Sequence, residues 1–496
     1  MNEQLRNGVL ERVSEHVPPI GSVYYMPHHP VIRPDKETTK LRIVYDASSR
    51  MVGPALNDTL HQGPCLLPEL IKVLLRFRFF KIGVIGDIEK AFLQVEIAEK
   101  DRDFLRVLWC RDISAPTSEV EVLRFTRCVF GVTSSPFHLM ATLQHHLEKY
   151  RSSDPSAVME LSNCMYVDDL SSGADNPSEA FEFLVGAKRI FSEGGFNLRK
   201  FITNSVELRN SINSMWSGSD SAAAYSEMTY SNYSTGSLDS CFVGRSEQRV
   251  LGVVWNNETD NFVFDFEPIL ESYKEKTLTK RALLQIIARC FDPLGLVSPI
   301  VMGLKIVFQQ VCRRRAEWDD LLSEEECRHL NRLFRDLEEV RYVYVSRFVL
   351  LAERSMLETV QLVAFCDASK LGYGVVIYIR SAHEKGVSVR MLVSKGRLAP
   401  IKEQSIPRLE LLACLLLARL TSMVRSVLQT VARVDNEFYF SDSRTALCWI
   451  KNKTQSFKQF VENRAIEIRH KAPEPCWGHI AGEGNPADLI SRGCTA

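Results

Sequence analysis

Two aspartates, Asp168 and Asp169, stand side by side in the stretch MYVDDLSSG, directly after an apolar run. Neighbouring side chains of a strand point to opposite faces, so the pair fits the tip of a tight hairpin. Asp87 follows another apolar strand, KIGVIG. Three carboxylates at strand ends can hold two divalent cations for phosphoryl transfer, and hard oxygen ligands select Mg²⁺ or Mn²⁺. A plain acidic turn remains the alternative for the pair alone, because Asp favours turns.

A second set of acids lies near the end of the chain. Asp367 lies inside an apolar strand in AFCDASKLGYG, where a charge is costly unless it coordinates something. Glu410 lies on the apolar helix SIPRLELLACLLLARL, Asp442 at a strand-to-helix junction in FYFSDSRTALCWI, and Asp488 in NPADLISRG. Taken singly, Asp442 and Asp488 could be helix N-caps, and Glu410 a solvent-facing residue at a helix start.

Elements in the first half must position the first set. LRIVYDA alternates like a strand, KIGVIGDIEKAFLQVEI predicts a buried strand passing into a helical turn, and RFTRCVFG is strand-like. A helix is predicted from about residue 135 to 150 with Pro136 in its first turn, then the MYVDD hairpin, then an amphipathic helix over about residues 176–191. Residues 210–246 are rich in Ser, Gly, Tyr and Asn, and this composition predicts a flexible insertion or linker.

The second half alternates strands and helices. RVLGVVWN is strand-like, and helices are predicted over about residues 279–290 and, after Pro293, Gly295 and Pro299, up to Arg315. From about residue 360 the pattern predicts three adjacent strands, a helix over about 407–428, the strand EFYFSD, the helix SRTALCWIKN and a final helix start at NPADLISRG.

Composition limits the classes of function. The chain has 496 residues, 45% of them hydrophobic and 25% charged, which is typical of a globular protein with two or three domains. Lys plus Arg and Asp plus Glu both number 61, so a polyanion must bind in a locally basic cleft. The thirteen cysteines form no CxxC pair, and neither a signal peptide nor a membrane span is evident. We therefore expect an intracellular protein.

The motifs DIEKAFLQV, FGVTSSPF and YVDD occur in the order of the palm motifs of reverse transcriptases, which they resemble. Together with LRIVYDAS they are most similar to LTR retrotransposons of the BEL/Pao type, and the order of the four later acids resembles ribonuclease H. The resemblance implies a multidomain α+β and α/β fold: a right-hand polymerase with a connection and a C-terminal RNase H-like mixed sheet. The implied domains are fingers and palm over 1–205, a flexible Ser-rich insertion over 206–246, thumb and connection over 247–355, and RNase H over 356–496.

The resemblance also implies roles for single residues. All seven acids match catalytic metal ligands: Asp87, Asp168, Asp169, Asp367, Glu410, Asp442 and Asp488. Phe92 matches the residue that excludes a 2′-hydroxyl, Arg42 and Lys200 match residues near the triphosphate, and Phe130 and Gly131 begin a segment that contacts nucleotide and template. Taken singly, Phe92 could be a core residue, Gly131 a turn, and Arg42 and Lys200 surface charges. Ribonucleases H often carry a His before the last acid. Here Glu483 holds the matching position, and His479 could be a plain strand residue.

The implied function is an RNA-directed DNA polymerase of a retrotransposon, combined with hydrolysis of RNA in RNA–DNA hybrids. The expected cofactors are two Mg²⁺ or Mn²⁺ ions per site. The expected partners are RNA template, DNA primer, RNA–DNA hybrid, deoxynucleoside triphosphates and other Gag-Pol products such as protease and integrase, without a membrane. We expect a cytoplasmic location, including virus-like particles, with access to the nucleus. The alternative is an inactive nucleic-acid-binding remnant. The basic clusters Arg76/Arg78/Lys81 and Arg313/Arg314/Arg315 are candidates for phosphate contacts, or else solvated faces.

Overall fold

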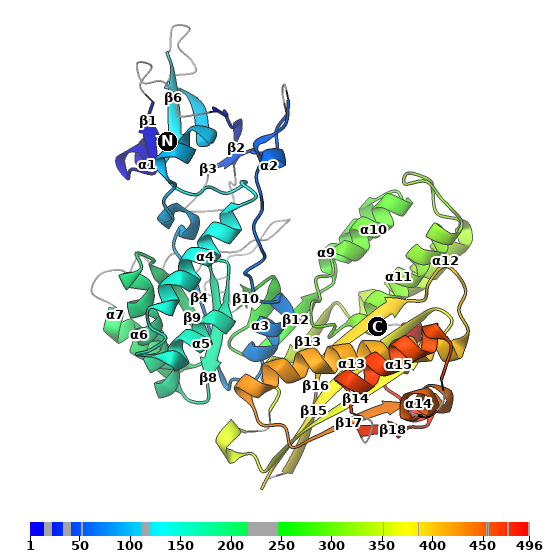
Figure 1. Ribbon diagram of the computed structural model, residues 1–496. Helices are drawn as coiled ribbons and strands as arrows, with labels where there is room; N and C mark the ends of the chain where they lie inside the picture. Colours follow the sequence, from blue (N-terminus) through cyan, green and yellow to red (C-terminus); the bar gives the residue numbers. More distant parts are fainter. Residues whose placement is uncertain are drawn as a thin grey trace. The chain divides into compact units, whose positions relative to one another are not determined.

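The computed structural model (Figure 1) describes residues 1–13, 22–32, 41–50, 53–111, 119–216, 247–350, 352–384, 386–452, 454, 456–473 and 476–494. The chain forms two compact units. The first contains residues 1–68, 84–171 and 177–244, and the second contains 69–83, 172–176 and 245–496. Two short segments from the predicted palm therefore belong to the unit that holds the C-terminal half.

The first unit is built from short sheets and helices. Its helices are α1 (Asn2–Arg6), α2 (Leu56–Thr59), η1 (Ala91–Gln94), η2 (Glu99–Leu105), α4 (Ser135–Glu148), α5 (Pro155–Cys164), α6 (Pro177–Glu193) and α7 (Val206–Trp216). Its strands, of which β4 and β8 continue into the second unit, are β1 (Leu10–Arg12), β2 (His28–Ile32), β3 (Leu41–Tyr45), β4 (Ile82–Ile88), β5 (Arg106–Cys110), β6 (Val120–Phe125), β7 (Met165–Tyr166), β8 (Asp169–Ala174) and β9 (Leu198–Thr203). The sheet that matters here has the order β7-β8-β4-β9.

Local patterns in this unit are found where the sequence predicts them. β3, β4 followed by η1, the β7–β8 hairpin and α6 occupy the expected segments, and α4 begins with Pro136 in its first turn. The predicted flexible insertion differs at its start, because α7 continues to Trp216. Leu208 and Ile212 of α7 are buried, so this stretch has an apolar face that packs as a helix. The rest of the predicted insertion, residues 217–246, lies outside the described residues.

The second unit combines two sheets with helices. Its helices are α3 (Leu70–Phe77), α9 (Glu267–Glu275), α10 (Lys280–Ala288), α11 (Ser298–Arg313), α12 (Glu324–Glu339), η3 (Arg354–Met356), α13 (Ile406–Val431), α14 (Arg444–Lys451), α15 (Gln459–Lys471), η5 (Gly482–Gly484) and α16 (Asp488–Arg492). Its strands are β10 (Glu247–Val250), β11 (Val253–Asn256), β12 (Asn261–Asp265), β13 (Tyr342–Ser346), β14 (Thr359–Ala368), β15 (Gly372–His383), β16 (Gly386–Leu398), β17 (Asn436–Ser441) and β18 (Trp477–His479). One sheet has the order β10-β11-β12-β13, the other β16-β15-β14-β17-β18.

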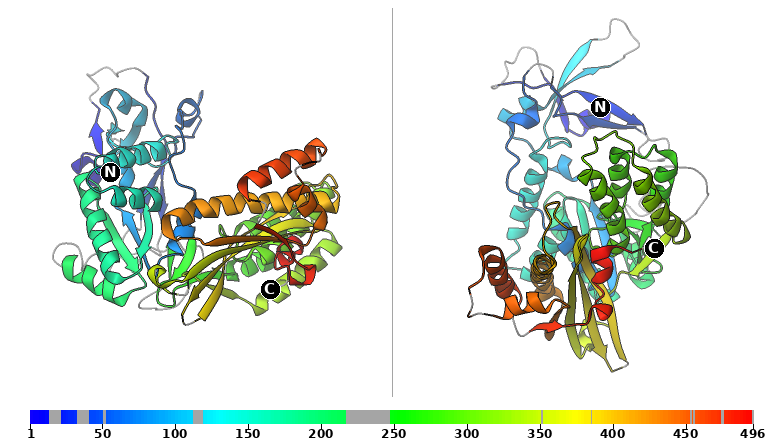
Figure 2. Two further views of the ribbon diagram at one scale, coloured as in Figure 1. Left: turned by 60° about the horizontal axis from the view of Figure 1, so that its bottom comes forward. Right: turned by 90° about the vertical axis from the view of Figure 1, so that its right-hand side faces the viewer.

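The five-stranded sheet is mixed, with β14 antiparallel to β15 and parallel to β17. Helix α13 covers one of its faces, and α16 lies on the other (Figure 2). Helix α11 packs on the α16 side, where Met302 of α11 and Ile490 of α16 both fill the space above Gly396 of β16. The predicted thumb and connection region therefore includes a helix that covers the five-stranded sheet.

Helix α13 is the one helix among the described residues that is long and apolar enough to cross a membrane, with a mean hydropathy of 1.8. Its most apolar 18-residue stretch is 67% buried inside the protein, and the core helix of a globular protein can be equally long and apolar. Glu410 and Cys414 are among its buried residues.

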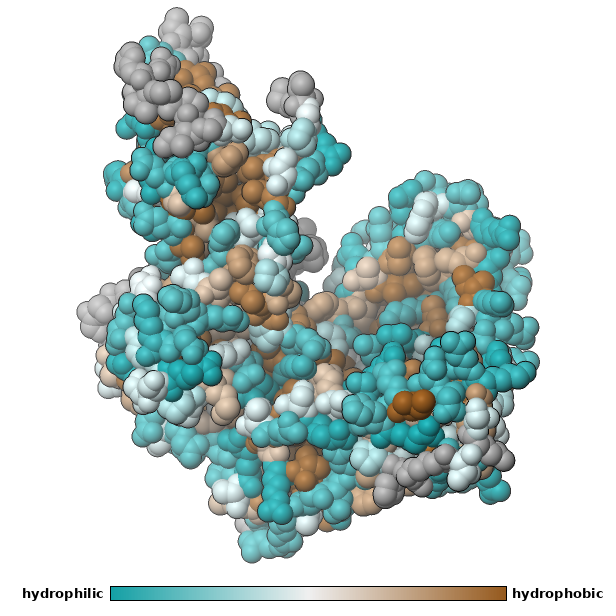
Figure 3. Space-filling model, viewed as in Figure 1, coloured by the Kyte–Doolittle hydropathy of each residue, from teal (hydrophilic) through white to brown (hydrophobic). Residues whose placement is uncertain are grey.

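Many large apolar side chains of the described residues are buried in the core, and most of the visible surface is hydrophilic (Figure 3).

The basic residues at the end of α3 are buried, which makes one suggestion from the sequence wrong. Arg76 and Arg78 are 3% and 1% exposed. Arg78 donates hydrogen bonds to the carbonyl oxygens of Arg347, Ser346 and Leu392, and Lys81 forms an ion pair with Glu353. The two arginines therefore stabilise the packing inside the second unit and cannot reach phosphate groups of a nucleic acid.

Candidate active sites

The three acids of the first half lie near one another. Asp87 is at the end of β4, and Asp168 and Asp169 are at the tip of the β7–β8 hairpin. The backbone N–H of Ile88 donates a hydrogen bond of 2.8 Å to the carbonyl oxygen of Asp168, which ties the hairpin tip to β4 beside Asp87. Val167, just before the pair, has a φ of 60°, a strained value for a β-branched residue. The hairpin tip therefore lies beside the end of β4, and the role of these three acids as metal ligands stays a prediction.

The electrostatics of this site follow first from burial and then from the crowding of like charges. Desolvation by the surrounding atoms, followed by the negative charges of Asp168 and Asp87, raises the pKa of Asp169 to about 7, although Asp169 as a whole is exposed. Burial also raises the pKa of Asp87, with the Lys200 charge opposing and the Asp168 charge adding to this shift. A divalent cation would remove this repulsion, because it stabilises the ionised form of each carboxylate.

Lys200 lies opposite the acids, with its Nζ 3.7 Å from Oδ2 of Asp87. It occupies an irregularity in the pairing of β4 with β9, where Ile85 pairs with Ile202 and Asp87 with Arg199. Lys200 itself has a φ of 55°. This bulge places the amine of Lys200 beside Asp87. Lys200 is therefore not only a solvated surface charge. Arg42 lies in β3 opposite Val31, and its side chain is outside the described part of the chain.

Two of the residues predicted to contact nucleotide and template, Phe92 and Phe130, pack against each other edge to face. Phe92 in η1 is 4% exposed, and its ring lies 4.4 Å from that of Phe130, which is 56% exposed. Gly131 has a φ of 95°, and a Cβ there would lie 2.6 Å from the carbonyl oxygen of Tyr45. Asn57, which the sequence did not suggest, donates a hydrogen bond of 2.8 Å to the Gly131 carbonyl oxygen. It also accepts a hydrogen bond of 2.9 Å from the backbone N–H of Thr133.

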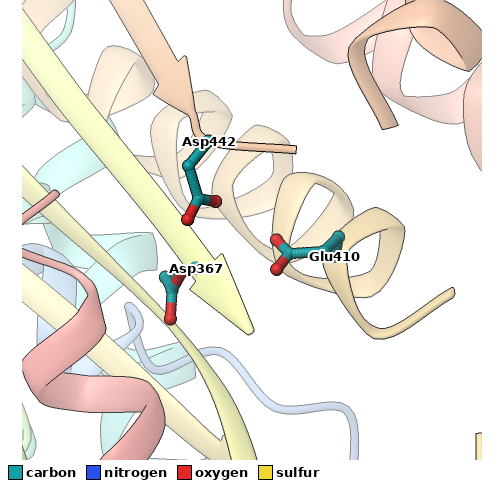
Figure 4. A group of neighbouring side chains, drawn as sticks. All are labelled: Asp367, Glu410 and Asp442. Atoms are coloured by element: carbon teal, nitrogen blue, oxygen red, sulfur yellow. The ribbon is translucent and has the colours of Figure 1, made fainter. Parts of the chain in front are cut away.

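The second set of acids forms a tight cluster. One carboxylate oxygen from each of Asp367, Glu410 and Asp442 lies within 4.8 Å of the others, and the three side chains point toward one another (Figure 4). Asp367 comes from β14, Glu410 from the first turns of α13 and Asp442 from the end of β17. The N-cap of α14 is Ser443 rather than Asp442, and Glu410 is 6% exposed. The capping and solvent-facing alternatives therefore do not describe these two acids.

This cluster has the properties of a cation site. Burial and then the charges of Asp367 and Asp442 raise the pKa of Glu410 to about 9, and burial is the main reason that the pKa of Asp367 rises to about 6. Oε2 of Glu410 and Oδ1 of Asp442 are buried without a hydrogen-bond partner. Buried polar atoms normally have a hydrogen-bond partner. These two oxygens have none within the protein, so they are open to a ligand from outside the chain. Three hard oxygen donors fit Mg²⁺ or Mn²⁺.

Asp488 is not part of the three-acid group. Its Oδ1 lies 2.5 Å from Nε of Arg492, one turn further along α16. Its charge still contributes to the raised pKa of Asp367, so it is near the cluster. The N-cap of α16 is Ala487, which rules out a capping role for Asp488.

His479 and Glu483 are the two candidates for a proton-transfer group at the second cluster. His479 ends β18, and its Nε2 lies 3.2 Å from the carbonyl oxygen of Asp442. Glu483 lies in the exposed turn η5. His479 is therefore beside the cluster in space, whereas the assignment of either residue as a proton-transfer group stays a prediction.

A groove of about 860 Å³ in the second unit is separate from this chemistry. Its lining includes Arg354, Arg425 and Arg433, and none of the seven acids. Arg354 pairs with Asp175 and Arg425 with Glu437, so these guanidinium groups are already engaged. The groove is not a third candidate active site.

Solved structures with a similar fold are those of the foamy viral protease-reverse transcriptase. The first, the dRH form in complex with double-stranded DNA, has 17% identity and a TM-score of 0.55, and the match covers 97% of this chain and 68% of that chain. The complexes with RNA/DNA hybrid and with dsDNA have 16% identity, TM-scores of 0.52 and 0.53, and coverage of 98% of this chain and 53% and 82% of theirs. At this identity the likeness shows the fold. No curated protein matches the chain.

The fold is therefore similar to that of the foamy viral protease-reverse transcriptase, and a fold of this kind is what the motifs predicted. Residues 279–443 match the family model described as the Pao retrotransposon-like RNaseH-like domain. The matched segment runs from α10 to the residue after Asp442, so it includes α11 together with most of the nuclease sheet. This match and the likeness to the foamy viral structures agree with the Pol fragment of the Pao/BEL type that the motifs predicted.

Proposed function

We propose that this chain is an RNA-directed DNA polymerase of a Pao-type retrotransposon that also hydrolyses the RNA strand of RNA–DNA hybrids. The observation that carries the proposal is the presence of two separate carboxylate clusters, each with acids whose pKa is raised by burial and by neighbouring acids. Such shifts are typical of catalytic sites. The double-stranded DNA and RNA/DNA hybrid bound in the foamy viral structures support the same substrate class.

In the polymerase site, Asp87, Asp168 and Asp169 would hold two divalent cations, which activate the attacking oxygen and stabilise the leaving one. Lys200, 3.7 Å from Asp87, would neutralise charge near the pyrophosphate. Phe92 would pack under the sugar, where a buried ring held by Phe130 leaves little space for a 2′-hydroxyl. Arg42 would contact the triphosphate through its guanidinium group.

In the nuclease site, Asp367, Glu410 and Asp442 would hold the cations, with Asp488 joining from α16. When bound there, the cations would supply Lewis-acid chemistry at the scissile phosphate. Glu410 must lose its proton when a cation binds, because a carboxylate ligand is ionised. Proteolytic partners, integrase, virus-like particles and a cytoplasmic location with access to the nucleus belong to the same proposal.

Primer extension and hybrid cleavage by the same preparations test the proposal. Asp168→Asn should lower extension on poly(rA)/oligo(dT) by about 100-fold or more and leave hybrid cleavage unchanged, on the scale of losing a transition-state-stabilising group. Asp442→Asn should do the reverse. Asp101→Asn, an exposed acid in η2, serves as the control and should change neither activity.

The outcomes separate the proposal from its alternative. Loss of both activities from either cluster variant would contradict two separate sites. A wild-type protein that binds template–primer but incorporates no nucleotide with Mg²⁺ or Mn²⁺ would instead favour the inactive remnant.

A further inference from the structure

The segment NPADLIS is fastened to β14 on both sides of Asp367. Asn485 donates from Nδ2 to the carbonyl oxygen of Cys366 at 3.0 Å. Ser369 donates from Oγ to the carbonyl oxygen of Ser491 at 2.8 Å. Between these two attachments, the hydroxyl of Ser491 donates to Oδ2 of Asp367 itself. Three contacts therefore hold this segment against the chain around Asp367, and one of them reaches the Asp367 carboxylate itself.

These contacts are buried. Ser491 is fully buried, Asn485 is 4% exposed and Asp367 is 3% exposed. A serine hydroxyl has one proton, and the Asp488 carbonyl at 3.1 Å is its weaker alternative acceptor. A hydrogen bond to an ionised carboxylate is stronger than one to a neutral carbonyl, so the hydroxyl is directed at Asp367. It occupies Oδ2 and leaves Oδ1 of Asp367 for other ligands.

Helix α16 is held rigidly enough to serve as a support. A Cβ on Gly374, the residue that pairs with Asp367 across β14 and β15, would lie 2.3 Å from Cγ2 of Ile490. A Cβ on Gly493 would lie 2.9 Å from the backbone nitrogen of Gly303 in α11. Because backbone approaches backbone at this crossing, α11 fixes the end of α16 that carries Ser491.

We propose that Ser491 is a positioning residue of the nuclease site, which orients the Asp367 carboxylate for the cations through its hydroxyl. The inference rests on the proposed nuclease function and assigns to the segment NPADLIS a second role besides carrying Asp488. Ser491 does not touch substrate. It orients Asp367, the proposed cation ligand, in the way that outer hydrogen bonds orient metal ligands elsewhere.

The test compares Mn²⁺ binding by full-length wild type, Ser491→Ala and Thr421→Ala, measured by electron paramagnetic resonance of free Mn²⁺ without nucleic acid. Thr421 is the matched control because it is also fully buried in the same unit, and its hydroxyl donates only to carbonyls of α13. Ser491→Ala should weaken Mn²⁺ binding at the nuclease site about 10-fold or more, and Thr421→Ala should not. Asp442→Asn identifies the binding that belongs to this site.

Hybrid cleavage by Ser491→Ala should require a correspondingly higher Mn²⁺ concentration, while primer extension stays as in wild type. If Ser491→Ala does not fold, Ser369→Ala replaces it. This change removes the 2.8 Å bond that holds the Ser491 carbonyl without emptying the core, and it should weaken Mn²⁺ binding in the same direction to a smaller extent.

Equal Mn²⁺ affinity in wild type and Ser491→Ala, or in wild type and Ser369→Ala when that variant is used, overturns the inference. The same holds if Thr421→Ala weakens binding as much as Ser491→Ala, since the effect would then reflect general loosening. If the wild type lacks any Mn²⁺ binding that Asp442→Asn removes, the proposed nuclease function fails together with the inference.

Discussion

At the scale of single residues, Glu410 shows how a site can oppose stability. Its carboxyl is buried next to Asp367 and Asp442, and its pKa is raised to about 9. The unfolded chain loses this proton near the ordinary Glu pKa of about 4.3. Between these two values the folded protein holds a proton that the unfolded chain has released. The free energy of unfolding contributed by this group therefore falls as the pH rises through this window.

Glu410→Gln should make the metal-free protein more stable at pH 8, and the gain should shrink toward zero near pH 4. The amide cannot ionise, so it avoids a cost of about 1.4 kcal/mol for each pKa unit between the two states. Urea unfolding in EDTA at both pH values measures the difference. Glu437→Gln is the control with the opposite sign. Burial raises the pKa of Glu437, but hydrogen bonds from Arg425 and Tyr439 outweigh this and lower it, so Gln should cost stability at pH 8. A Glu410→Gln protein less stable than wild type at pH 8 would contradict the assignment.

Gly131→Ala should reduce primer extension sharply and leave hybrid cleavage intact. The φ of 95° strains any L side chain, and the new Cβ would lie 2.6 Å from a backbone oxygen of β3, which cannot rotate away. Each effect costs on the order of 1–3 kcal/mol. Gly186→Ala in α6 is the control, because nothing lies within 4 Å of its added Cβ. Equal extension by the two variants would mean that the Gly131 loop tolerates a shift.

At the scale of elements, Arg347 joins the end of α3 to the sheet that contains β12 and β13. It is fully buried and donates to the carbonyl oxygens of Phe77, Phe80 and Lys81. It also forms a two-point contact with Asp260, at 2.6 and 2.9 Å, and its guanidinium lies over the ring of Phe77. One side chain thus satisfies three carbonyls at the end of α3.

Arg347→Ala should lower the free energy of unfolding of the second unit by roughly 3–5 kcal/mol, because it removes a fully buried guanidinium that partners the half-buried Asp260 and three carbonyls. Arg419→Ala removes an exposed ion pair with Glu467 and should cost less than about 1 kcal/mol. Denaturant titration of both variants provides the comparison. A cost for Arg347→Ala as small as that for Arg419→Ala would show that water replaces the guanidinium at this position.

Elements and acids with a local signature could be predicted from the sequence. Apolar runs and alternation gave β4, β14 and β17, and their ends located Asp87 and Asp442. Features that depend on contacts between distant residues could not be predicted. From the sequence alone, Arg78 would be taken for a surface residue. Only the fold brings the carbonyl oxygens of Leu392 and Ser346 to its guanidinium group. The hydroxyl of Ser491 is one polar atom in a short helix, and only the fold places it on Asp367.

At the scale of the whole molecule, the compact units do not follow the predicted linear domains. Helix α3 belongs to the unit formed mainly by residues 245–496, and Val73, Leu74, Leu75 and Phe77 of this helix are fully buried. The ring of Phe77 packs edge-on against Trp255 at 5.1 Å. A chain cut at the boundary suggested by the sequence would leave these apolar partners without cover.

We therefore expect residues 247–496 expressed alone to aggregate or to unfold without a cooperative transition. Joining residues 69–83 to their N-terminus through a flexible linker should restore a cooperative transition, because it returns α3. The same linked chain with Phe77→Ala is the control and should unfold at a lower denaturant concentration. A stable, soluble 247–496 fragment would show that α3 is dispensable for this unit.

The distant partners of α3 also affect events during translation. Phe77 and Arg347 are 270 residues apart in the chain. At 5–20 residues per second, roughly 15–50 s pass between the synthesis of the two. During that interval the apolar face of α3 has left the ribosome without its partner surface. The nascent polypeptide should therefore be a client of holding chaperones until its later part has been made.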